Sequence, residues 1–162
     1  MEKQVVLREI ENTDNIQVAQ LIRAVLEEYG VPKVGSAYED KALEDMFTAY
    51  STPRSIFFVV ADGKKIIGCA GIAPLDNYDG NVCELQKMYL TKETRGLGLG
   101  KKLIVQCLAK AKGFGFDGCY LETMPYMEVA QNLYVKNGFT HIEAPMGCTG
   151  HTACPVYMYK AL

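Results

Sequence analysis

The feature that most constrains the fold is the segment 83–113, where a strand, a glycine-rich turn and a helix follow one another directly. Residues 83–90 are rich in apolar and strand-forming side chains, and residues 91–94 are polar. After an Arg-Gly-Leu-Gly-Leu-Gly run at 95–100, apolar residues recur with the spacing of one helical stripe, at Leu103, Ile104, Cys107, Leu108 and Ala111. Gly113 predicts the end of this helix. The segment predicts a domain that combines strands and helices.

The three glycines of the turn, Gly96, Gly98 and Gly100, precede a helix whose first backbone N–H groups have no intrahelical partner. Because glycine has no Cβ, these donors can turn toward one ligand at close range. The helix dipole and the side chains of Arg95 and Lys101 add positive potential. The pattern therefore predicts a site for an anion, such as a phosphate or pyrophosphate. The alternative, a flexible turn without a ligand, does not explain why glycines, cations and a helix start coincide.

A dinucleotide-binding loop is a rival interpretation of the same glycines. The spacing here is G-x-G-x-G, and Lys101 stands where the third glycine of G-x-G-x-x-G belongs. The phosphate loop G-x-x-x-x-G-K-[ST] does not occur in the sequence either. A nucleotide-dependent oxidoreductase is therefore the weakest of the function classes considered.

The composition is that of an ordinary globular chain, with 49% hydrophobic and 22% charged residues over 162 positions. This length predicts one domain, residues 1–162, with a substantial core. A formal net charge of −2 favours neither nucleic acid nor an anionic membrane as a partner. No apolar run reaches transmembrane length, and the first residues lack a signal-peptide core. The six cysteines form no C-x-x-C pair, so we expect reduced, mostly buried thiols and a cytoplasmic location.

The remaining patterns place further elements around this segment. Strands are expected at residues 5–10, 55–61, 66–72, 83–90, 117–123, 139–142 and 156–159, and helices at 14–29, 40–50, 101–113 and 127–137. The Asp62-Gly63 turn predicts a hairpin. The strand at 117–123 follows a strand and a helix, so a right-handed crossover should make it parallel to 83–90. The expected fold class is α/β (α+β), with one mixed, mostly antiparallel sheet of six or seven strands flanked by about four helices.

Two motifs resemble those of the GCN5-related N-acetyltransferase (GNAT) family. Residues 95–100, after the strand 84–90, are similar to the acetyl-CoA signature R/Q-x-x-G-x-G/A. Residues 130–139, Ala-Gln-Asn-Leu-Tyr-Val-Lys-Asn-Gly-Phe, are similar to the family pattern A-x-x-L-Y-x-K-x-G-F. The resemblance covers the chain from about residue 55 to the end. It implies the acyl-CoA N-acyltransferase fold, whose parallel strands 4 and 5 splay apart, and acetyl transfer from acetyl-CoA to an amine by direct attack in a ternary complex.

The resemblance also implies roles for single side chains. Tyr134 occupies the tyrosine of the second motif and would protonate the departing thiolate as a general acid, or would only pack on the sheet. Glu84 lies where some members carry the general base, which takes the amine proton directly or through water. Glu122 is the competing base, and either carboxylate could instead bind a cationic acceptor. His151 is a further candidate for substrate binding, as one wall of the acceptor site.

The expected acetyl-CoA site combines the glycine loop with the main chain of the preceding strand, where the N–H of Tyr89 or Leu90 would polarise the acyl carbonyl. The candidate cofactor-binding residues are Met88, Tyr89, Leu90, Arg95, Gly96, Leu97, Gly98, Gly100, Lys101, Asn132 and Lys136. One position departs from the family, because Met127 stands where many members have the asparagine of N-x-x-A. Whether Asn132, on a later turn, replaces that contact with pantetheine stays open.

No metal is expected. Cys148, His151 and Cys154 form C-x-x-H-x-x-C, which supplies three ligands where structural zinc normally has four. A Cys–His nucleophilic pair in this loop would lack an identifiable oxyanion loop.

These observations predict an acetyl-CoA-dependent N-acetyltransferase that acts on a small-molecule amine, without nucleic-acid or membrane partners. The alternative is a module that binds or senses CoA without turnover, which the departure at Met127 and the open identity of the base would fit. A homodimer is also considered, since the last strand, 156–159, would form a natural sheet edge.

Overall fold

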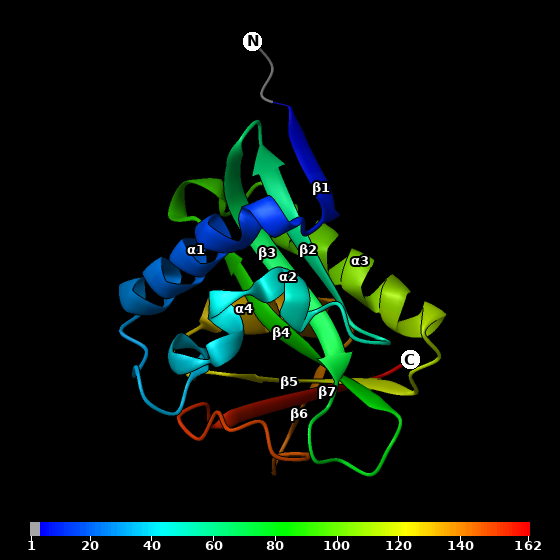
Figure 1. The fold of residues 1–162 in the computed structure, drawn as a ribbon. Coiled ribbons are helices and arrows are strands. Elements are labelled where there is room, and N and C mark those ends of the chain that lie inside the picture. The colour runs from blue at the N-terminus through cyan, green and yellow to red at the C-terminus, as the bar shows by residue number, and fades with distance from the viewer. Residues whose placement is uncertain (1–3) are drawn as a thin grey trace.

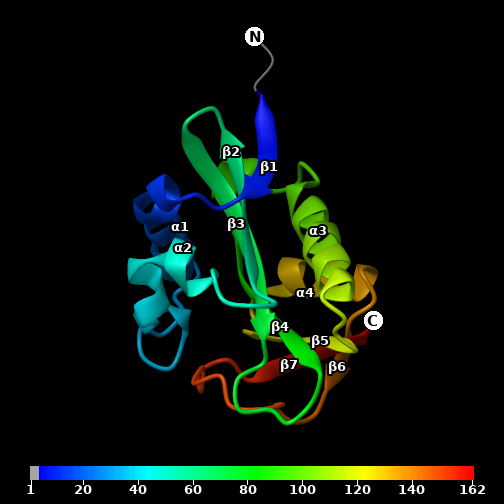
Figure 2. The ribbon, with the colours of Figure 1, turned by 45° about the vertical axis from the view of Figure 1, so that its right-hand side comes forward.

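The computed structural model describes residues 4–162, which form one seven-stranded sheet with helices on both faces (Figures 1 and 2). The strands are β1 (Val5–Glu9), β2 (Ile56–Asp62), β3 (Lys65–Pro74), β4 (Val82–Leu90), β5 (Gly118–Thr123), β6 (Thr140–Ile142) and β7 (Val156–Ala161). Their order across the sheet is β1-β2-β3-β4-β5-β7-β6. Among the described pairs, β4 and β5 run parallel and all the others antiparallel. The fold class expected from the sequence is confirmed.

The helices cover the two faces of the sheet. On one face lie α1 (Asn15–Glu28) and α2 (Met46–Ala49), and on the other lie α3 (Leu99–Gly113) and α4 (Glu128–Lys136), as Figure 2 shows. Successive residues of β2 serve different cores, because Phe57 belongs to the core under α1 and Phe58 to the core under α3. Since both faces are covered, β2 and β3 are continuous buried apolar runs.

The continuous helix expected at residues 40–50 is wrong. This segment contains a 3₁₀ turn, Lys41–Glu44, and the single turn of α2. Asp45 separates them with φ −153° and ψ 79°, and its carboxylate accepts hydrogen bonds from the Thr48 N–H at 3.1 Å and hydroxyl at 2.8 Å. This aspartate caps the second turn and thereby interrupts the first. Leu43 and Met46 are nevertheless buried, as their apolar spacing predicts.

The last strand in the chain, β7, is not a sheet edge, so that expectation is also wrong. It pairs with β5 from Val156 to Ala161 and, on its other side, with β6. The outermost strands of the described sheet are β1 and β6. Two copies of the chain therefore could not pair through residues 156–159 without opening this sheet.

The feature that positions the site is the divergence of β4 from β5. The two strands pair over three positions, from Val82 with Gly118 to Glu84 with Tyr120. Beyond Glu84, no described strand pairs with this side of β4. A bulge at Lys87, whose φ is +50°, shifts the register between β4 and β3. The strands thus splay as expected.

The cysteines are all free. Those at 69, 83, 107 and 119 are buried, as expected, whereas Cys148 is exposed and Cys154 partly buried. Within residues 4–162, no helix combines the length and the apolar character that crossing a membrane requires.

Candidate active site

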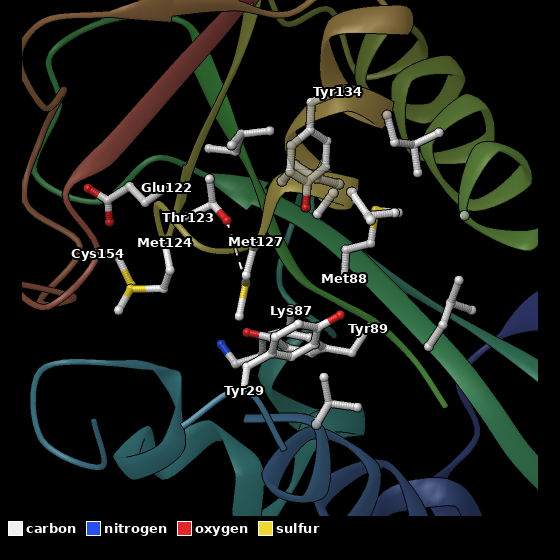
Figure 3. Close-up of a pocket in the computed structure, with 18 of the residues that line it drawn as sticks. Tyr29, Lys87, Met88, Tyr89, Glu122, Thr123, Met124, Met127, Tyr134 and Cys154 are labelled. Carbon is white, nitrogen blue, oxygen red and sulfur yellow. Dashed lines mark hydrogen bonds between the residues drawn. The ribbon is translucent and has the colours of Figure 1, made fainter. Parts of the chain in front are cut away.

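A cavity of about 640 Å³ lies where β4 and β5 diverge, and Figure 3 shows side chains that line it. Its walls come from β4, β5, α4, the end of α1, the glycine loop and the loop that contains His151. The predicted site residues that line it are Glu84, Met88, Tyr89, Leu90, Arg95, Gly96, Gly98, Gly100, Lys101, Glu122, Asn132, Tyr134, Lys136 and His151. Leu97 is the exception, because this residue is 67% exposed and is not part of the lining.

The glycine loop forms one end of the cavity. Gly96 and Gly98 have φ of +81° and +80°, and a Cβ built at either position would meet no atom within 4 Å. Gly98 is the N-cap of α3, so the helix begins at Leu99, two residues earlier than expected. Gly100 has a different role, because a Cβ there would lie 2.8 Å from Cδ2 of Leu133 and would force this side chain of α4 to shift. The first two glycines leave space for a ligand, and the third permits close packing.

The guanidinium of Arg95 is held by protein groups. It forms a bidentate pair with Glu28 of α1 at 2.6 and 3.0 Å, and it donates to the carbonyl of Leu90 at 3.0 Å. These contacts tie the loop to α1 and to the end of β4. Lys101 and Lys136 also line the cavity, and neither forms an ion pair in the described part of the chain.

The bulge in β4 determines which main-chain donors face the cavity. The carbonyl of Lys87 accepts a hydrogen bond from the Cys69 thiol at 3.3 Å. Tyr89 pairs with Cys69 in the β3–β4 register, and the N–H of Thr91, two residues further on, donates to the carbonyl of Ile67 at 3.0 Å. Lys87, Tyr89 and Thr91 therefore direct their main-chain groups toward β3. The alternation of a strand then directs the N–H groups of Met88 and Leu90 toward the gap. Of the two expected polarising donors, Leu90 keeps this geometry, whereas the Tyr89 N–H faces the wrong side.

Tyr134 projects from α4 into the cavity, and its hydroxyl points toward the region of Met88 and Met127 in Figure 3. The ring is buried and packs against Phe139, with the ring centroids 6.0 Å apart. Burial raises the pKa of the phenol, so the hydroxyl keeps its proton at neutral pH. The residue can therefore donate a proton to a group in the cavity.

Glu84 lies at the point where β4 and β5 separate and is only 4% exposed. Its carboxylate accepts a hydrogen bond from the Gln86 amide, whose oxygen in turn accepts one from the Tyr50 hydroxyl. Burial raises the pKa of Glu84 to about 7, and the nearby charge of Glu122 acts in the same direction. A carboxyl group with this pKa can exchange a proton at neutral pH.

Glu122 of β5 faces Glu84 across the divergence of the strands. It accepts hydrogen bonds from the hydroxyls of Tyr120, at 2.7 Å, and Thr149. Ligand-type atoms of Glu84, Glu122 and His151 lie within 4.8 Å of one another. Within the described residues this is the grouping with the spacing of metal ligands, and neither cysteine of the C-x-x-H-x-x-C segment belongs to it.

A trio of charged side chains completes this end of the cavity. Asp40 accepts from Nζ of Lys87 at 3.1 Å and from Nε2 of His151 at 2.9 Å. Burial opposes the charge of Asp40, but the bond to His151 and the charge of Lys87 outweigh it, so the pKa of Asp40 is lowered. Burial likewise opposes the charge of His151, but Asp40 outweighs it and raises the pKa of the imidazole. The trio favours a protonated histidine.

Several members of this polar network were not predicted from the sequence. Gln86 could have been found, because it lies two residues after Glu84 and therefore on the same face of the strand. Lys87 is displaced by the bulge, which no local pattern indicated. Asp40 is 111 positions from His151 in the chain, and its contact depends on two loops that meet only in the folded protein.

The fold and the site define a class of protein. Two parallel strands separate over a cavity that has a glycine loop at a helix start on one side and a buried carboxylate on the other. A model of the acetyltransferase (GNAT) family matches residues 18–139. The chain belongs to this family and is an N-acetyltransferase, an acyltransferase enzyme.

Individual relatives agree with this assignment. The chain is 40% identical to the N-acetyltransferase YjgM of Escherichia coli over 158 residues, which cover 97% of this chain and 95% of the relative. An acetyltransferase of the GNAT family from Staphylococcus aureus has a similar fold, with a TM-score of 0.86, 23% identity and coverage of 98% and 99% of the two chains. The PaiA N-acetyltransferase of Thermoplasma acidophilum, solved in complex with coenzyme A, has a TM-score of 0.73 at 19% identity, with coverage of 98% and 99%.

Proposed function

We propose that the protein transfers an acetyl group from acetyl-CoA to the primary amine of a small molecule, by direct attack in a ternary complex. The observation that carries this proposal is the placement of the glycine loop, the free edge of β4, Tyr134 and Glu84 around one cavity. The structure of a fold relative with coenzyme A supports the choice of carrier. The net charge of −2 supports a small acceptor over nucleic acid or a membrane surface.

The cofactor would lie along β4. N–H groups at the start of α3, near Gly98, would bind its diphosphate, assisted by Lys101 and Lys136. Its pantetheine arm would pair with the edge of β4 that β5 leaves free, as an added strand does. The N–H of Met88 or Leu90 would then polarise the acetyl carbonyl.

The chemistry would use Glu84, which can exchange a proton at neutral pH, and Tyr134, which keeps its proton at neutral pH. Glu84 takes a proton from the acceptor ammonium, directly or through a water, and the neutral amine attacks the acetyl carbon. The new C–N bond forms as the C–S bond breaks, and the nitrogen releases its second proton to water to give the neutral amide. Tyr134 donates its proton to the departing thiolate, and the phenolate is later reprotonated from solvent.

We also propose a domain organisation and a cellular compartment for the protein. Residues 1–162 would act as one domain, since the described elements share one sheet. Six free cysteines, four of them buried, support a reducing compartment such as the cytoplasm.

The test is an acetylation assay over a panel of amines, with release of the CoA thiol as the readout. Tyr134→Phe and Glu84→Gln should each lower kcat by about 10²-fold or more, while the affinity for acetyl-CoA, measured by calorimetry, stays within about threefold of wild type. Exposed Glu143, replaced by glutamine, is the matched control. Tight binding of acetyl-CoA without thiol release from any amine would instead identify a CoA-sensing module.

A further inference from the structure

The acceptor end of the cavity contains two charged groups of opposite sign, of which Glu84, Glu122, Lys87 and His151 line the cavity. The negative group is the carboxylate pair Glu84 and Glu122, and the positive group consists of Lys87 and His151 bridged by Asp40. With three carboxylates against two cations, and with Glu84 titrating near neutral pH, the five side chains come close to charge balance as a set.

The negative group forms no direct ion pair with another described residue, although the charges of His151 and Lys87 are near enough to oppose the rise in the pKa of Glu84. In residues 4–162 neither Glu84 nor Glu122 forms an ion pair; their partners are the amide of Gln86 and the hydroxyls of Tyr120 and Thr149. Two adjacent carboxylates repel each other, which is one reason why the pKa of Glu84 is raised. A single ammonium ion bound between them would relieve this repulsion.

The positive group has the opposite imbalance. Asp40 is one carboxylate shared by two cations, and the pKa of His151 is raised by this contact. The imidazole uses Nε2 to reach Asp40, and its Nδ1 makes no hydrogen bond to any described residue. The protonated ring therefore has one N–H donor left for an anionic group of a ligand.

The spacing of the two groups suits a compact ligand. Ligand-type atoms of Glu84, Glu122 and His151 lie within 4.8 Å of one another. In an α-amino acid the nitrogen and the nearer carboxylate oxygen are roughly 3 Å apart by standard bond lengths. Charge-assisted hydrogen bonds of about 2.8 Å would connect such a pair of atoms to both groups at once.

Apolar side chains also line the cavity. They include Tyr29 and Val31 after α1 and Met124, Tyr126 and Met127 before α4. The centroid of the Tyr29 ring also lies 5.1 Å from the guanidinium carbon of Arg95. Figure 3 shows Met124 next to Glu122 and Met127 next to Thr123, with Tyr29 below them. Flexible methionine side chains adapt to apolar groups of different shapes.

From these observations we infer that the acceptor is a zwitterion, an α-amino acid with an apolar side chain. Its ammonium group lies between Glu84 and Glu122, and its carboxylate accepts a hydrogen bond from His151. Its side chain contacts Met124 and Met127. The identity of the transferred group rests on the proposed function, but the binding mode does not. Polyamines would leave the positive group unused, and simple amines would leave His151 without its anion.

The experiment compares L-leucine, L-methionine and L-phenylalanine, each with its amide and its decarboxylated amine, for wild type and His151→Gln. Because the three forms of each compound differ in amine basicity, the decisive quantity is the ratio of wild-type to variant kcat/KM for each compound. We expect this ratio to be about tenfold to a hundredfold for the free amino acid and below about threefold for the amide and the amine. Lys112→Gln, at an exposed position of α3, is the control and should change none of the ratios.

The outcomes separate this inference from the proposed function. Equal ratios for all three forms, or a preference for spermidine over every amino acid, would overturn the zwitterion. If no compound releases CoA, the proposed function fails, and calorimetry of the CoA-bound protein with L-methionine tests the binding site by itself. Binding that His151→Gln abolishes supports the zwitterion site. No binding of L-methionine, or binding that His151→Gln leaves unchanged, overturns it. Binding or activity that appears only with added Zn²⁺, and disappears with EDTA, would assign the three-residue grouping to a metal and overturn the inference.

Discussion

At the scale of single residues, the candidate active site contains a buried carboxyl group, that of Glu84, whose ionised form is destabilised by burial. Glu84 is 4% exposed, and burial raises its pKa from 4.5 to about 7. The folded protein therefore holds this proton up to about pH 7, whereas the unfolded chain releases it near pH 4.5. Linkage then requires the contribution of Glu84 to stability to fall as pH rises between these values.

Glu84→Gln should therefore stabilise the protein at alkaline pH while it removes the proposed base. The amide copies the neutral acid in shape, so the free energy of unfolding at pH 8 should exceed that of wild type by about 1–3 kcal/mol. At about pH 4.5 the difference should be much smaller, because wild-type Glu84 is then protonated in the folded state. Urea unfolding at both pH values measures the two differences. The same difference at both would show that Glu84 does not titrate as described.

At the scale of elements, the loop between β4 and α3 combines two conformational demands. Gly98 must adopt φ +80° to cap α3, and the space beside it must stay open. Asparagine and aspartate both tolerate this conformation better than other side chains and have nearly the same shape. They differ mainly in charge.

Gly98→Asp and Gly98→Asn thus form a matched pair that tests for a bound diphosphate. Both variants should lower the affinity for acetyl-CoA, because their side chains fill space in the loop. The aspartate should lower it by at least about a further tenfold, because it places a negative charge beside a negative ligand. Titration calorimetry at low and at high salt measures this, and the difference between the variants should shrink at high salt. Equal affinities for the two variants at low salt would argue against a phosphate in this loop.

At the scale of the whole molecule, the last strand of the chain, β7, is an interior strand of the sheet. β7 lies between β5 and β6, and its Met158 is fully buried in the core that also contains Tyr134 and Phe139. The strand therefore supports both the wall of the cavity and the short edge strand β6. A substitution of Met158 should therefore lower the stability of the whole domain.

Met158→Ala should lower the free energy of unfolding by about 2–5 kcal/mol, as is usual when a buried methionine is truncated. Val105→Ala, at a position of α3 that is 51% exposed, is the control and should change it by less than about 1 kcal/mol. Denaturant unfolding followed by circular dichroism measures both. A loss at Met158 no larger than that at Val105 would contradict the interior position of β7.

The sequence by itself determined the features that depend on neighbouring residues. Gly96 and Gly98 sit between a strand pattern and a helix pattern, and their freedom in φ is a local property, so the order of residues was enough to locate the loop. The hairpin, the parallel crossover and the two family motifs are local in the same sense. The apolar pattern also placed Leu43 and Met46 inside, although it did not show that Asp45 breaks the helix around them.

Only the tertiary structure decided what depends on residues distant in the chain. The pKa of Glu84 follows from burial under other elements and from the charge of Glu122, and no property of β4 alone contains it. The contact of Asp40 with His151 joins positions 111 residues apart, and β7 is internal only because β6 pairs with its second side. Desolvation and long-range pairing are properties of the packed chain, so the charges at the acceptor end could be recognised only once the fold had brought them together.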